Sequence, residues 1–230
     1  RCSRDWSSDV CSSDLGSGGG SIGWVDAQNR LHVGPRSAGS SPGPACYARG
    51  GTEPTVTDAN LVLGRLNAGH FLGGELRLDP SLASEALARL AAPLGYAGTQ
   101  GEVELAAGIL SIATVVMAGA VRRISVEHGR DPRDFVLFAY GGGGPLHASA
   151  LAHELSIPMV VVPPEPGNFS AIGMLLADAR LDDSKTFTGR MEECIVERMD
   201  EVFGAMERQA AASLEEEFAC DGVHFQRFAE

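Results

Sequence analysis

Residues 135–162 read FVLFAYGGGGPLHASALAHELSIPMVVV and carry the clearest structural pattern in the chain. Phe135–Tyr140 is an apolar run of strand length that ends at the consecutive glycines Gly141–Gly144. Pro145 suits the first turn of a helix, which the next residues continue. Met159–Val162 then follows as a second apolar run. The order strand, glycine loop, helix, strand predicts an α/β fold with a largely parallel sheet.

The loop Gly141–Gly144 predicts a ligand site. Consecutive glycines leave backbone N–H groups uncovered and permit conformations closed to other residues, and a helix N-terminus adds a partial positive charge. In open α/β sheets, ligands bind beyond the carboxyl ends of the strands. A nucleotide therefore suits this place, although the loop matches neither a P-loop nor G-x-G-x-x-G, because Leu146 and His147 stand where the third glycine would be. The alternative is a tight turn that only packs the helix onto the sheet.

His147 lies in the first turn of the predicted helix. The positive end of the helix dipole favours the neutral form of its imidazole. A neutral ring can donate a hydrogen bond to a ligand. A capping or packing role is the alternative.

The residues upstream of this unit predict a hairpin, a long loop and several helices. The spacing of apolar and polar residues predicts a hairpin at Ser21–Val33 and a structured loop at Gly34–Thr57. It also predicts a short helix at Thr57–Leu66, capped by Thr57 or Asp58, and a helix at Pro80–Leu94. A long core helix follows a Thr99/Glu102 capping box and is expected to stop at Gly129. Downstream, Met191–Phe218 predicts an acidic amphipathic helix.

Three further segments offer candidate chemistry. Gly18–Gly20 forms a nest of backbone donors that suits a phosphate or an acyl phosphate, or else a plain flexible turn. Asp58 is the candidate catalytic residue, as a ligand of Mg²⁺ or a group that orients water, although a helix cap is the favoured interpretation. Cys46 lacks a His or Asp partner in the sequence pattern, so a small packed cysteine is favoured over a nucleophile.

The composition limits the possible partners. The formal net charge is −12, and the positive surface that nucleic acid requires is missing. No uninterrupted apolar run reaches the roughly 18–20 residues of a membrane helix. The 5 cysteines show neither C-x-x-C nor a regular spacing, which favours a reduced, cytoplasmic chain without a zinc site. We therefore expect no nucleic-acid and no membrane partner.

The first residues differ in character from the rest. Asp5–Leu15 reads DWSSDVCSSDL, which resembles a translated sequencing-library adapter and lacks the apolar core of a signal peptide. We interpret residues 1–15 as foreign to the gene. The remainder is interpreted as an incomplete domain over 16–185 and the start of a further subdomain over 186–230.

Three strings resemble one family. GGGSIGWVDAQNRLHVGPRSAGSSPGPACYARGGTEPTVTDANLVLGRL (Gly18–Leu66), FAYGGGGPLHASALAHELSIP (Phe138–Pro158) and VPPEPGNFSAIGMLLADAR (Val162–Arg180) are similar to the hydantoinase A / 5-oxoprolinase family, which includes acetone carboxylase β subunits. Ala48 departs from the glycine that is commoner there. The D-x-G-G-T-type and G-G-T-S-T-D-type phosphate motifs of the family are absent, and we expect them before Gly16.

The resemblance implies an actin-like ATPase fold of the sugar-kinase/Hsp70 type, here cut at both ends. It places Gly141–Gly144 in the adenosine-contacting motif and implies ATP and Mg²⁺ as cofactors, a small cyclic amide as substrate and a hydantoinase B-type partner. The implied activity is ATP-dependent ring-opening hydrolysis, for which the fragment alone would be inactive. The alternatives are a β-type subunit of an ATP-dependent ketone carboxylase and a non-catalytic actin-like module that binds nucleotide for assembly.

Overall fold

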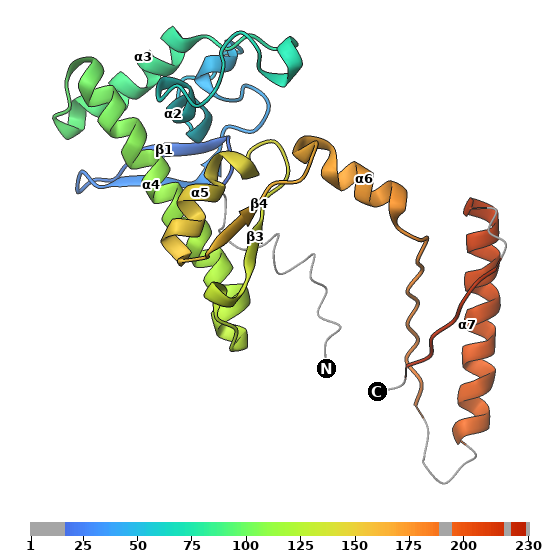
Figure 1. Cartoon of the computed structure of the whole chain (residues 1–230). Helices are drawn as coiled ribbons and strands as arrows, with labels where there is room; N and C mark the ends of the chain where they lie inside the picture. Colours follow the sequence, from blue (N-terminus) through green and yellow to red (C-terminus); the bar gives the residue numbers. More distant parts are fainter. Residues whose placement is uncertain (1–16, 189–194, 219–221, 229–230) are drawn as a thin grey trace. The chain divides into compact units, whose positions relative to one another are not determined.

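The structure is a computed structural model that describes residues 17–188, 195–218 and 222–228 (Figure 1). The chain divides into two units, Arg1–Ser170 and Ala171–Glu230. The short 3₁₀ turns are Ala45–Tyr47, Leu72–Gly74, Ala92–Leu94, Val126–His128, Pro132–Asp134 and Pro166–Asn168. The described strands and α-helices are β1 Ser21–Val25, β2 Leu31–Ser37, α2 Val56–Val62, α3 Pro80–Ala91, α4 Gly98–Ser125, β3 Val136–Phe138, α5 Gly144–Leu155, β4 Met159–Val161, α6 Phe169–Leu176 and α7 Ile195–Phe218.

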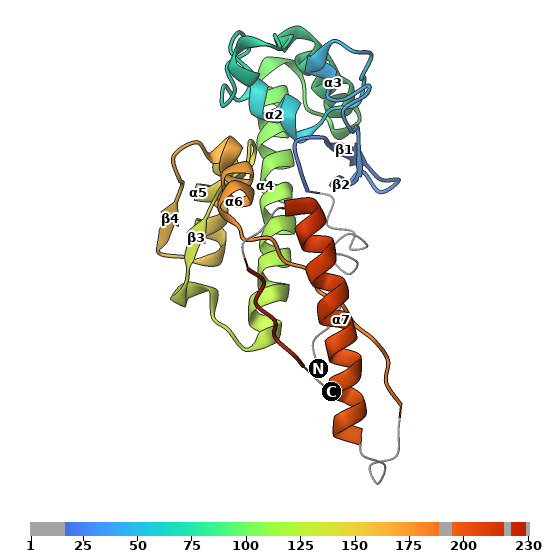
Figure 2. The ribbon, with the colours of Figure 1, turned by 90° about the vertical axis from the view of Figure 1, so that its right-hand side faces the viewer.

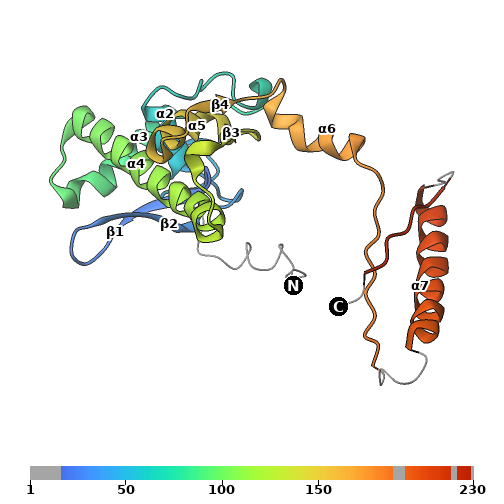
Figure 3. The same cartoon turned by 60° about the horizontal axis from the view of Figure 1, so that its bottom comes forward.

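The predicted hairpin is confirmed. Strands β1 and β2 pair antiparallel, and β2 runs on to Ser37, further than the sequence pattern indicated. The turn between them is held by Asp26, whose carboxylate accepts hydrogen bonds from the backbone N–H groups of Gln28 and Arg30, each at 2.9 Å. Strand β2 contacts α4, and Figure 3 shows the hairpin crossing this helix.

The start of α2 differs from the prediction. The N-cap is Thr55, and Thr55 and Asp58 form a capping box in which each side chain accepts from the other residue's backbone N–H. The sequence pattern predicted the cap at Thr57 or Asp58, because it assigned Thr55 to the loop Gly34–Thr57 and not to the start of the helix. Asp58 therefore occupies the third helical position, where its charge also favours the helix N-terminus.

The helices α3 and α4 are close to their predicted bounds. The 3₁₀ turn Val126–His128 follows α4 directly, and Gly129 caps that turn in a left-handed conformation. The predicted Thr99/Glu102 capping box was wrong. The N-cap is Ala97, which makes no side-chain capping hydrogen bond. The Glu102 carboxylate accepts instead from the hydroxyl of Ser84 on α3. Tertiary packing has redirected this side chain away from its own helix.

The order β3–α5–β4 is confirmed as an α/β unit. Strands β3 and β4 pair in parallel, with Leu137 opposite Val160, and α5 connects them. Gly143 is the N-cap of α5 and Pro145 lies in its first turn, as the sequence indicated.

Helix α4 forms the centre of the first unit (Figures 1 and 2). Leu105, Ile109 and Ala113 pack in one buried cluster with residues of α2, α3 and β2. Further along α4, Ala118 packs in another cluster with Ala152 and Leu155 of α5. Each large apolar side chain fully buried in this way contributes about 1.5–3 kcal/mol. One helix thus joins the hairpin side of the unit to the β3–α5–β4 side.

By length and composition, Gly98–His128 is also apolar enough to cross a membrane. This differs from the sequence expectation. The central helix of a folded domain passes the same test, and the buried residues of α4 pack against other helices of this chain. The observation is therefore weak support for a membrane segment.

The second unit contains the predicted acidic helix as α7, Ile195–Phe218, while 191–194 lie outside the described residues. Arg227 joins the terminal segment to this helix. Its guanidinium donates to Glu207 at 2.6 and 2.9 Å and to Asp200 at 2.8 Å.

Gly51 provides a test of the loop before α2. A Cβ at this position would lie 2.2 Å from the carbonyl oxygen of Gly43, closer than any real contact. We expect Gly51→Ala to lower the free energy of unfolding by about 1–3 kcal/mol, measured by chemical denaturation. Gly119→Ala on α4 is the control, because its Cβ meets nothing within 4 Å, and it should raise stability by up to about 1 kcal/mol. Equal stabilities of the two variants would contradict this packing.

Candidate functional site

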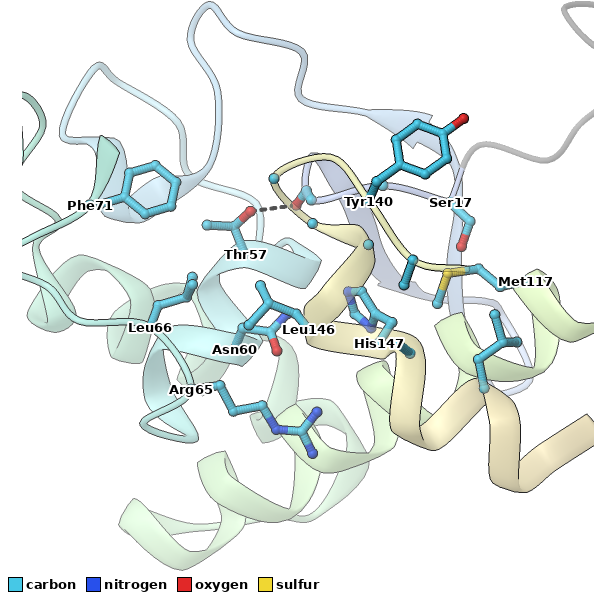
Figure 4. Close-up of a pocket in the computed structure, with 18 of the residues that line it drawn as sticks. Ser17, Thr57, Asn60, Arg65, Leu66, Phe71, Met117, Tyr140, Leu146 and His147 are labelled. Carbon is cyan, nitrogen blue, oxygen red and sulfur yellow. Dashed lines mark hydrogen bonds between the residues drawn. The ribbon is translucent and has the colours of Figure 1, made fainter. Parts of the chain in front are cut away.

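A cavity of about 860 Å³ lies in the first unit. This volume is within the range of small-molecule sites. Its lining comes from both predicted glycine segments, from α2 and the loop after it, and from α4, β3 and α5. Segments that are distant in the sequence thus meet at one place, which Figure 4 shows in close-up.

The glycine loop before α5 lies at this pocket. Gly142, Gly143 and Gly144 line it, whereas Gly141 anchors the loop by donating its N–H to the carbonyl of Pro166 at 2.7 Å. A Cβ added at Gly142 or Gly143 would meet nothing within 4 Å. The loop therefore leaves open space beside its backbone at the N-terminus of a helix, as an anion or a ribose requires.

The segment Gly18–Gly20 reaches the same pocket in part. Gly18 and Gly19 line the cavity, but Gly20 does not. The Gly18 N–H already donates to the Ser21 hydroxyl at 2.8 Å, and the Gly19 carbonyl accepts from the Thr57 hydroxyl at 2.9 Å (Figure 4). The predicted nest of donors is thus partly satisfied within the chain.

His147 lies at the pocket wall and is largely buried. Burial lowers its pKa first, and the nearby positive charge of Arg65 lowers the pKa further. The expected neutral form is therefore supported, but by causes other than the helix dipole invoked from the sequence. A neutral imidazole carries one donor and one acceptor for a ligand.

Two polar lining residues, Asn60 and Arg65, were missed by sequence analysis. Asn60 is 2% exposed, and its amide N–H donates to the Val56 carbonyl at 2.9 Å. Its Oδ1 is buried without a hydrogen-bond partner among the described residues. Both residues belong to the string that carries the family resemblance, which is the signal that could have drawn attention to them.

Asp58 does not line the pocket. Its carboxylate is fully buried and accepts from the backbone N–H groups of Ala45, Cys46 and Thr55 at 3.2, 2.8 and 2.8 Å, and from the Thr55 hydroxyl at 2.7 Å. Both oxygens are thereby engaged in holding the loop to α2. This geometry favours the cap interpretation over the catalytic one.

Cys46 is the packed residue that its sequence context indicated. It is fully buried, and burial beside the Asp58 carboxylate raises the pKa of its thiol far above the ordinary value, which disfavours a thiolate nucleophile. Within the described ranges, no three His, Cys, Asp or Glu side chains gather to hold a metal ion.

A family model described as Hydantoinase/oxoprolinase matches residues 9–183. The chain belongs to the hydantoinase/oxoprolinase family. The resemblance seen in the sequence is thereby confirmed. The match begins inside the segment 1–15 that we interpreted as foreign, so that boundary stays a prediction.

Three relatives describe the family's range. Caprolactamase subunit alpha of Pseudomonas jessenii is 43% identical over 80% of this chain and 26% of its own length. A crystal structure of the ATP-dependent caprolactamase from that organism superposes with a TM-score of 0.64 at 38% identity, over 90% of this chain and 30% of that one. Acetophenone carboxylase gamma subunit of Aromatoleum aromaticum is 48% identical over 71% of this chain and 22% of its own length.

The third relative is a nucleotide-free acetone carboxylase, whose structure gives a TM-score of 0.64 at 33% identity, over 70% of this chain and 22% of that chain. The mixed helix and strand arrangement is therefore that of ATP-dependent enzymes of the family. The chain thus spans only 26% and 22% of the lengths of the caprolactamase and acetophenone carboxylase subunits.

Asp58→Asn tests the cap interpretation. The asparagine would place an amide NH₂ group against N–H donors that now donate to the carboxylate, and two donors cannot bond to each other. We therefore expect the free energy of unfolding to fall by about 3 kcal/mol. Thr55→Val, which removes one hydroxyl, should lower it by about 1 kcal/mol. Denaturation curves measure both. If Asp58→Asn unfolds like the parent chain, the cap interpretation is wrong.

The burial of His147 predicts a pH dependence of stability. Its folded pKa lies below the ordinary value of 6.5, so as the pH falls through 6.5 the unfolded chain binds a proton that the folded chain does not. Stability should fall between pH 7 and pH 5, and His147→Gln should weaken that fall. His128→Gln, at an exposed residue outside the pocket, should leave it unchanged. Thermal unfolding across this range, with an NMR titration of the ring, measures the effect.

Proposed function

We propose that this chain contributes the adenosine side of a nucleotide site to an ATP-dependent enzyme that opens a cyclic amide. The observation that carries the proposal is the convergence of Gly18–Gly19 and Gly142–Gly144 on one pocket. The ATP-dependent relatives support the choice of nucleotide. We propose an actin-like ATPase fold for the complete domain, as the family resemblance implies.

The pocket fits the chemical parts of ATP. Gly142 and Gly143 leave room for a ribose or a phosphate against the backbone, and apolar side chains such as Leu137 and Leu146 offer a surface to a flat base. His147 supplies a neutral hydrogen-bonding group beside them. The described lining contains no carboxylate, so we assign no residue of this chain to Mg²⁺.

The reaction follows from the chemistry of an unstrained lactam, which resists hydrolysis. When bound, ATP supplies the phosphoryl group that turns the amide oxygen into a good leaving group. The residues of this chain bind and orient the nucleotide for that transfer. The backbone of the glycine loop is preorganised for this role, because helix α5 holds it in place.

A second function is favoured by the identity of 48% to a subunit of an acetophenone carboxylase. In that case the activated group is a ketone enolate or bicarbonate. The two functions are distinguished by the compound that stimulates ATP hydrolysis by the complete enzyme. A cyclic amide should stimulate it in the first case, and a ketone with bicarbonate in the second. Binding of nucleotide with no turnover under either condition would favour the assembly module.

The relatives are named as subunits, which supports a partner protein for the complete enzyme. We propose a hydantoinase B-type subunit that supplies the remaining chemistry, in a cytoplasmic assembly. Mg²⁺ stays part of this proposal through the resemblance alone.

Gly142→Val tests the pocket directly. The added side chain enters open space, so the fold should persist while the space for a nucleotide shrinks. We expect the affinity of the chain for ATP and ADP, measured by calorimetry, to fall by about tenfold or more, about 1.4 kcal/mol. Gly167→Val is the matched control, since that glycine also has open space but lies outside the pocket. Equal affinities of parent and both variants would count against the assignment.

A further inference from the structure

The charge of the pocket is opposite to that of the chain. The sequence holds 30 Asp and Glu against 18 Lys and Arg. Even so, the described lining of the pocket contains no acidic side chain, while Arg65, His70 and His147 contribute to it. A cavity kept free of carboxylates in an acidic protein favours an anionic ligand.

Arg65 is the only arginine or lysine in the described lining of the pocket. In the described part of the chain, its guanidinium has no ion pair and no side-chain hydrogen bond, whereas Arg36 and Arg122 pair with Glu53 and Glu154 at 3.0 and 3.1 Å. It is exposed, and it lies near enough to His147 to act on that ring electrostatically. Figure 4 shows its side chain among those that line the pocket.

Asn60 supplies an independent observation at the same wall. The residue is almost fully buried and lines the pocket, and its Oδ1 has no hydrogen-bond partner among the described residues. A buried acceptor left unsatisfied is unfavourable for the folded chain. Polar groups that find no partner within the chain are typical of a site whose ligand completes them.

We propose that Arg65 binds an anionic oxygen group of the ligand, with the His147 ring beside it, and that Asn60 Oδ1 accepts a hydrogen bond from a donor on the same ligand, such as a ribose hydroxyl or an amide N–H. A guanidinium offers several N–H donors in a planar fork, which matches phosphoryl and carboxylate oxygens. This inference rests on the proposed function, because the first source of the anionic group is the phosphates of a nucleotide bound at the glycine loop. The carboxylate of a cyclic amide such as 5-oxoproline is the second.

The test measures binding of four probes to the full chain by calorimetry: adenosine, ADP, pyrophosphate and 5-oxoproline. Arg65→Gln removes the charge and keeps most of the length of the side chain. Arg77→Gln is the matched control, because Arg77 is exposed, lies outside the pocket and has no ion pair in the described residues. Circular dichroism verifies that both variants are folded.

We expect Arg65→Gln to lower the affinity for ADP and for pyrophosphate by about tenfold or more, while the affinity for adenosine changes by less than about twofold. Arg77→Gln should leave the affinities for all of these probes unchanged. Loss of 5-oxoproline binding alone supports the anion site and assigns it to a substrate carboxylate.

Two results separate the inference from the proposed function. If the parent chain binds pyrophosphate through Arg65 but binds no adenosine, the anion site stands and the nucleotide function fails. If ADP binds equally well to the parent and to Arg65→Gln, with 5-oxoproline also unaffected, the role of Arg65 is overturned while the nucleotide function stands. A parent chain that binds no anionic probe overturns the inference as well.

Discussion

The close packing of α4 is the constraint on which the first unit depends. Ala106, Ala113 and Ala118 are all but inaccessible to solvent, and their small side chains let neighbouring elements approach the helix backbone. One part of α4 packs with α2, α3 and β2, and another packs with α5. Because a single helix contacts both groups, the two glycine segments are brought to the lining of one cavity.

The loop before α2 depends on a buried carboxylate. Asp58 gathers backbone N–H groups from Ala45, Cys46 and Thr55, which lie on two separate segments of that loop. An ionised group in an apolar interior is stable only when it is hydrogen-bonded in this way. The arrangement fixes the loop against α2, and thereby sets the positions of Tyr47 and Thr57 in the pocket wall. Asp58, the candidate catalytic residue of the sequence, therefore shapes the site from outside the pocket.

The pocket combines an open glycine backbone with polar side chains that the described part of the chain leaves partly unsatisfied. The glycine loop offers space, burial and the nearby Arg65 lower the pKa of the His147 ring, and Asn60 Oδ1 has no hydrogen-bond partner among the described residues. The unsatisfied acceptor of Asn60 is unfavourable for the folded chain, and the buried His147 ring is unfavourable at acidic pH. Their presence together in one cavity is expected of a binding site, where a ligand supplies the missing partners.

The sequence by itself determined the local structure and the family. Apolar periodicity located the hairpin, the long helix and the β3–α5–β4 unit, because these patterns reflect which face of each element is buried. Caps were harder to predict, since Thr55 rather than Thr57 or Asp58 is the N-cap of α2, and the Glu102 carboxylate accepts from Ser84 instead of capping its own helix. Only the tertiary structure decided which residues share the pocket. Asn60 and Arg65 meet His147 through the packing of α2, α4 and α5, and contacts between segments so distant in the sequence leave no periodic signal in it.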